Sequence, residues 1–119
     1  MHKYLVYGAY GLLTFGGAMH FLVDVVSQYA RGKRVPGPET TLYYGLNTAY
    51  ALSQVLFGLM ALLIARYAFH LLDQWPALAL SLTAATCWLI FTFLFIEYRE
   101  PKIGAGVFAA LIIAAAVTA

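Results

Sequence analysis

The chain has 119 residues, of which 63% are hydrophobic and only 10% are charged. A soluble domain typically carries about 25% charged residues, so this composition excludes a water-soluble globular protein and indicates a membrane protein. The formal net charge of +2 is too small to indicate nucleic-acid binding. The single cysteine, Cys87, excludes an internal disulfide framework and a metal site built from several thiolates.

Four apolar segments are long enough, or nearly so, to cross a membrane, which takes about 20 residues in a helix. They cover residues 4–29, 41–65, 76–98 and 103–119 and are separated by charged residues, proline and glycine. Short connections between consecutive helices make neighbours antiparallel. The sequence therefore predicts an all-α polytopic membrane protein, in which residues 1–119 form one small bundle of four antiparallel transmembrane helices.

Lysine and arginine are distributed unequally between the two sides that this topology creates. The first and third connections hold five of them, and the termini with the second connection hold two: Arg31, Lys33, Arg34, Arg99 and Lys102 against Lys3 and Arg66. Cytoplasmic loops of membrane proteins carry an excess of these residues. We therefore expect a multi-pass protein of the cell membrane with its basic loops in the cytoplasm and both termini outside.

Polar residues within the predicted spans fall into stripes. On the first predicted helix a stripe recurs every four positions, at Gly16, His20, Asp24 and Gln28. On the second it comprises Tyr43, Asn47, Tyr50, Gln54 and Gly58, and on the third Thr86, Ile90, Phe93 and Glu97. Because polar side chains are costly in lipid, the three stripes are expected to face a common interior.

The candidate catalytic residues are His20, Asp24 and Glu97, which belong to the half of the bundle nearest the basic loops. One helical turn separates His20 from Asp24, so the carboxylate would orient the imidazole, as general acid–base chemistry near neutral pH requires. Glu97 would complete the site from the third helix. The alternatives are a polar pair that satisfies itself between helices and, for Glu97, a solvated charge at the membrane surface.

The candidate ligand-binding residues are amides and aromatic side chains on the second and third helices: Tyr43, Asn47, Tyr50, Gln54 and Trp88. Hydrogen bonds between helices and an aromatic belt at the membrane surface are the alternative roles for such residues. His20 lies in the opposite half from His2 and His70, which disfavours haem held by two histidines. No metal-ligand spacing is evident, so neither a metal nor a cofactor is expected.

Small residues at four-residue spacing on the last helix, Gly106, Ala110 and Ala114, suggest close helix packing and a homo-oligomer, most simply a dimer. The expected partners are membrane lipids and a small amphipathic or lipophilic ligand, with no nucleic acid. Three functions fit: binding or transport of a small amphipathic molecule through a polar pocket, isomerase-type acid–base catalysis on a lipophilic substrate, or an accessory subunit without chemistry of its own.

Overall fold

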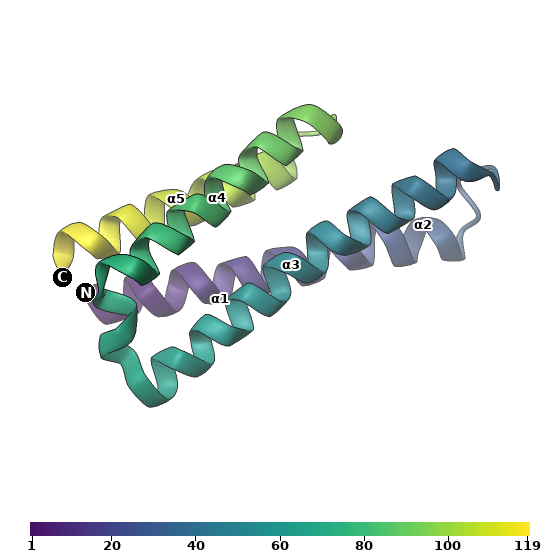
Figure 1. The fold of residues 1–119 in the computed structure, drawn as a ribbon. Helices are drawn as coiled ribbons and strands as arrows, with labels where there is room; N and C mark the ends of the chain where they lie inside the picture. The colour runs from purple at the N-terminus through teal and green to yellow at the C-terminus, as the bar shows by residue number, and fades with distance from the viewer.

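The computed structural model describes all 119 residues and contains helices but no strands (Figure 1). Helix α1 (His2–Phe21) continues through a π-helical turn, η1 (Leu22–Val26), into α2 (Ser27–Ala30). Helix α3 (Pro38–Ala68) leads into a 3₁₀ turn, η2 (Phe69–Asp73), and is followed by α4 (Trp75–Phe95) and α5 (Glu100–Thr118). Four helical segments are long and apolar enough to span a membrane, which confirms the predicted fold class.

The helix ends differ from the predicted bounds where proline and an extended residue intervene. Helix α3 begins at Pro38 and α5 has Pro101 in its first turn, a position that suits proline because the N–H it lacks would have no partner there. Helix α4 ends at Phe95, three residues earlier than predicted, because Ile96 is extended, with φ −119° and ψ 123°. The segment from Ile96 to Arg99 is therefore a turn.

The helices form two antiparallel hairpins, one made of α1 to α3 and the other of α4 and α5. Helix α1 packs against α3 and α5, and α5 packs against α4. Both termini and η2 lie at one end, whereas the 31–37 connection and the 96–99 turn lie toward the other, where the hairpins diverge (Figure 1). We call this second end the open end.

Two glycines bring the backbones of α1 and α3 close together. A Cβ at Gly17 would lie 2.9 Å from Gln54 Cβ, and a Cβ at Gly58 would lie 2.9 Å from the backbone oxygen of Tyr10. Only a residue without a side chain fits such gaps, and small residues are how membrane helices approach each other closely. The contact fixes the polar face of α3 against that of α1.

Aromatic side chains fill the space between α3 and α4. The Trp88 ring lies between those of Phe57 and Phe108, with ring centroids 5.5 and 5.9 Å apart, and its indole N–H donates to Ser53 Oγ at 3.0 Å. The opposite face of α3, including Leu52, Leu59 and Leu63, is exposed, as expected of a surface that meets lipid.

The prediction that the third polar stripe faces the interior is wrong. Its members Thr86, Ile90, Phe93 and Glu97 are all exposed, and α4 instead buries Ser81, Ala85, Trp88 and Thr92. The Thr86 hydroxyl donates to the Leu82 carbonyl oxygen at 2.8 Å, so its hydrogen bond is made within the helix. A threonine satisfied in this way can face lipid at little cost, and the face that packs against the other helices carries small side chains beside Trp88.

The two hairpins differ in length. The spans that start at His2 and Pro38 have 29 and 36 residues, whereas α4 and α5 have 21 and 19. At 1.5 Å per residue the shorter pair measures about 30 Å, which matches the hydrocarbon thickness of a bilayer. The longer hairpin therefore projects past the shorter one at the open end.

Candidate functional site

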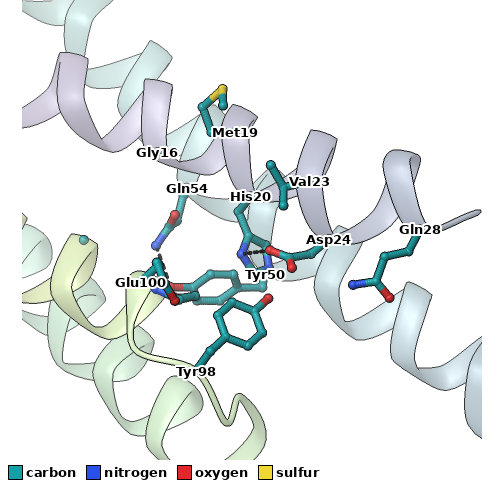
Figure 2. A pocket seen from close by; sticks show the side chains of 12 residues that line it. Gly16, Met19, His20, Val23, Asp24, Gln28, Tyr50, Gln54, Tyr98 and Glu100 are labelled. Atoms are coloured by element: carbon teal, nitrogen blue, oxygen red, sulfur yellow. Dashed lines mark hydrogen bonds and ion pairs between the residues drawn. The ribbon is translucent and has the colours of Figure 1, made fainter. Parts of the chain in front are cut away.

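A cavity of about 610 Å³ lies at the open end, between the two hairpins (Figure 2). The first hairpin contributes side chains from α1, η1, α2 and α3, and the second contributes the 96–99 turn and the start of α5. Its lining consists of Gly16, Met19, His20, Val23, Asp24, Gln28, Tyr50, Gln54, Tyr98, Glu100, Pro101 and Gly104.

All four members of the first polar stripe line this cavity, although a strict four-residue spacing drifts around an α-helix of 3.6 residues per turn. The π-helical turn η1 corrects the drift, because its i→i+5 hydrogen bonds place more residues in one turn. Asp24 lies within η1 and stays on the same side as His20. Single π turns inside α-helices are frequent at functional sites.

His20 and Asp24 form a buried pair, which we call the dyad. Nδ1 of His20 lies 2.9 Å from Oδ2 of Asp24, and each residue is only 8% exposed. Nε2 of His20 lies 2.9 Å from Oδ1 of Asn47, whose amide nitrogen donates to the Tyr43 backbone oxygen at 2.9 Å. The expected burial of His20, Asp24, Asn47 and Gln54 is thus confirmed.

Two tyrosine rings flank the dyad. The Tyr50 ring meets the His20 ring edge-on at a centroid distance of 5.1 Å, and the Tyr98 ring is nearly parallel to the His20 ring at 6.4 Å. Gln54 donates from Nε2 to the Tyr50 hydroxyl at 3.0 Å, and this hydrogen bond holds the Tyr50 ring in place. The dyad is therefore held among aromatic rings and amides.

The Tyr98 hydroxyl is the one buried side-chain polar atom that forms no hydrogen bond. In Figure 2 it lies on the same side of the cavity as Asp24 and His20. Burial raises the pKa of this hydroxyl, and the neighbouring Asp24 carboxylate raises it further. Tyr98 therefore keeps its proton through the neutral pH range, and its hydroxyl can donate only toward the neighbouring Asp24 carboxylate.

The structure does not bring Glu97 together with the dyad. Glu97 is exposed and lines a separate hollow of about 390 Å³ with Arg34, Tyr43 and Asn47, on the other side of Tyr98. The prediction for Glu97 assumed that α4 continues through this residue, but the helix ends at Phe95. In an extended segment alternate side chains point in opposite directions, so Ile96 is buried, Glu97 points outward and Tyr98 turns inward.

Three of the predicted ligand-binding residues, Tyr43, Asn47 and Trp88, do not line the cavity. Tyr43 borders the smaller hollow, where its ring lies 3.4 Å from the Arg34 guanidinium carbon and its hydroxyl accepts a hydrogen bond from Gln28. Trp88 is part of the aromatic core between α3 and α4. Tyr50 and Gln54 do line the cavity, whereas Asn47 borders the smaller hollow and contacts His20 from behind.

Sequence reasoning missed the contribution of the second hairpin, namely Tyr98, Glu100 and Gly104. None of the three was among the predicted site residues. Pro101 carried a usable signal, because proline prefers the first turn of a helix and so indicates that α5 begins near Glu100.

The cavity is acidic. Asp24 and Glu100 line it together with His20, and no lysine or arginine does. Lys102 instead donates to the backbone oxygens of Ile96 and Tyr98 at 2.6 and 3.0 Å, and Arg34 donates to Gln28 Oε1. The nearby basic side chains therefore hold the turn and the loop in place rather than neutralising the cavity.

Comparison of the chain with protein families, curated proteins and solved structures gives no significant match. The function is therefore inferred from the chemistry of the cavity. No group of three or more histidine, cysteine, aspartate or glutamate residues is placed to hold a metal ion.

Proposed function

We propose that this multi-pass protein of the cell membrane binds a small amphipathic molecule in the cavity at its open end. The observation that carries the proposal is a cavity of about 610 Å³ that encloses a buried histidine–carboxylate pair between four membrane-spanning segments. Small-molecule sites typically measure about 300–1,000 Å³ and combine apolar walls with a few convergent polar groups.

The lining suits a molecule with one polar and one apolar end. The polar groups of the lining belong to the dyad, Gln54 and Tyr98, whereas Met19 and Val23 are apolar. The Tyr98 hydroxyl lies next to Asp24, so it adds to the polar side of the cavity.

Binding accounts for the site better than transport through a single copy. Toward the terminal end the bundle interior is filled by Trp88 and by a hydrogen bond of 2.7 Å between the Tyr10 hydroxyl and Ser81. The cavity at that end, beside His2 and Asp73, measures only about 90 Å³.

Passage across the membrane would need a second copy. Gly106, Ala110 and Ala114 are partly or fully exposed on α5, so this face is the proposed dimer contact.

The contact between His20 and Asp24 also favours a second candidate, an intramembrane enzyme that moves a proton on a lipophilic substrate. However, both ring nitrogens of His20 already have partners, Asp24 and Asn47, so the imidazole presents no free nitrogen to the cavity. Acid–base catalysis would require Asp24 or Tyr98 to meet the substrate, with His20 in a supporting role.

Photo-crosslinking tests the proposed function. An alkyl chain that carries a diazirine and a polar head is added to the protein in lipid nanodiscs, and the labelled residues are mapped by mass spectrometry. We expect labels on residues that line the cavity, such as Met19 and Val23, and their loss in Gly104→Leu, which places a side chain in the cavity.

Gly8→Leu is the matched control, because Gly8 in α1 is exposed, does not line the cavity and lies outside the proposed dimer contact. A Cβ at either glycine meets no atom within 4 Å, so both variants should fold. Labelling spread evenly over the lipid-facing surface, or equal labelling in both variants, would refute binding in the cavity.

A further inference from the structure

We propose that the ligand is an organic cation and that it exchanges with a single proton held by the dyad. This inference rests on the proposed function, since it specifies the ligand of the same cavity. It follows from the way in which Asn47 fixes the hydrogen positions on His20.

The backbone oxygen of Tyr43 determines the orientation of the Asn47 amide. A carbonyl oxygen only accepts hydrogen bonds, so the Asn47 atom that lies 2.9 Å from it is the NH₂ group. The amide oxygen of Asn47 therefore faces His20 Nε2, also at 2.9 Å. Because this oxygen accepts as well, Nε2 must carry a hydrogen.

The state of Nε2 decides what lies between His20 and Asp24. The 2.9 Å between Nδ1 and Oδ2 holds one proton, either on the imidazolium, next to a carboxylate, or on the carboxylic acid, next to a neutral imidazole. In both forms the dyad has a net charge of zero. Loss of that proton leaves the Nδ1 lone pair against an anionic oxygen in a buried site, which is unfavourable unless another cation replaces the proton.

The surroundings of the dyad favour a cation over an anion. The titratable groups that face it are Tyr50 from α3, Tyr98 from the turn and Glu100 from α5. None of them carries a positive charge, and the partly exposed ring of Tyr98 is the kind of group that attracts organic cations. On the loop side, the Arg34 guanidinium is stacked on Tyr43 and bonded to Gln28, and it does not line the cavity.

The exchange balances in charge and forms no covalent bond. One monovalent cation enters and contacts the Asp24 carboxylate, and the proton shared by Nδ1 and Oδ2 leaves to water. His20 remains neutral with its hydrogen on Nε2, still bonded to Asn47. The charge of the occupied site therefore equals that of the empty site, and the cation and the proton compete.

Three probes of similar shape and different charge test this exchange: tetraphenylphosphonium, neutral triphenylphosphine oxide and anionic tetraphenylborate. Binding to the full chain in nanodiscs is measured by equilibrium dialysis against empty nanodiscs. We expect the cation to bind about tenfold more tightly than the neutral probe, a preference of the size that cation–π contacts provide.

Proton release is measured in the same samples. We expect one proton per bound tetraphenylphosphonium in weakly buffered solution, and a Kd that rises up to about tenfold for each unit of decrease in pH where the dyad is protonated. Asp24→Asn should abolish both the release and the preference for the cation. Asp73→Asn, which alters the His2–Asp73 pair at the opposite end, should leave both unchanged.

The outcomes separate the two proposals. If no probe binds above empty nanodiscs, binding in the cavity is itself refuted. If the neutral probe binds as tightly as the cation, or if the cation binds without releasing a proton, the exchange is refuted while the proposed binding function stands. The comparison of probes uses the unmodified protein, so it remains decisive even if Asp24→Asn fails to fold.

Discussion

Replacement of Gly58 by alanine tests the packing that positions the site. The added Cβ would lie 2.1 Å from Thr14 Oγ1 and 2.9 Å from the Tyr10 backbone oxygen. The Thr14 hydroxyl can rotate away only by giving up its hydrogen bond to the same Tyr10 oxygen, whereas the carbonyl moves only with α1. Overpacking of this kind costs about 1–3 kcal/mol. This cost outweighs the gain in stability of up to about 1 kcal/mol that comes from replacing glycine by alanine within a helix.

Gly11→Ala is the matched control, because a Cβ at Gly11 in α1 meets no atom within 4 Å. We expect Gly58→Ala to lower the free energy of unfolding by about 1–2 kcal/mol and Gly11→Ala to leave it unchanged or raise it by up to about 1 kcal/mol. Unfolding is followed in mixed micelles of increasing denaturing detergent by circular dichroism.

A second substitution identifies which contact is responsible. Thr14→Ala removes the hydroxyl and leaves the Tyr10 oxygen in place, so Thr14→Ala combined with Gly58→Ala should recover only part of the lost stability. The same loss should weaken ligand binding, because α1 and α3 carry His20 and Tyr50 on opposite sides of one contact. Equal or greater stability of Gly58→Ala than of the unmodified protein would refute the close approach of the two helices.

Three further predictions concern the site and its surroundings. His20→Ala should lose tetraphenylphosphonium binding in equilibrium dialysis while the protein still accumulates in membranes, whereas Glu97→Gln should retain binding because that side chain points away from the cavity. Cys87 is exposed in the middle of α4, so it should react with a membrane-soluble maleimide and resist a charged one, as mass spectrometry can show. The raised pKa of Tyr98 means that the folded state favours the neutral hydroxyl, so its contribution to stability is complete below the unfolded pKa of about 10 and is lost as pH rises further. Unfolding measured at alkaline pH should therefore show a smaller decline in Tyr98→Phe than in the unmodified protein.

The first hairpin was predictable because two strong constraints act on it together. Long apolar segments had to be membrane spans, and the polar residues within them had to avoid lipid. His20, Asp24, Asn47 and Gln54 are all at most 8% exposed, as these constraints require. The distances within the dyad could not be predicted, because the π turn at Leu22–Val26 contains no proline or glycine that would indicate it in the sequence.

The second hairpin shows where the same reasoning fails. Polarity predicts burial only when a side chain needs a partner from another helix, and Thr86 finds one within its own helix. A shift of three residues in the end of α4 was then enough to exchange the roles of Glu97 and Tyr98, since the turn follows a period of two rather than 3.6. Errors at helix ends therefore matter most where a site is built from a turn.

The position of the cavity follows from the unequal lengths of the two hairpins. Midway along the bundle, Trp88 and Phe108 fill the space between them, and nearer the termini His2 joins α1 to both η2 and α5 through Asp73 and the Ala115 backbone oxygen. At the other end α4 and α5 stop after about 30 Å, at the level of the dyad, while α1 to α3 continue toward the basic loop. There the second hairpin contributes only the Tyr98 ring of the Ile96–Arg99 turn and the first residues of α5. The cavity therefore opens beside Asp24, and in the proposed exchange this opening is where the cation would enter and the proton would leave.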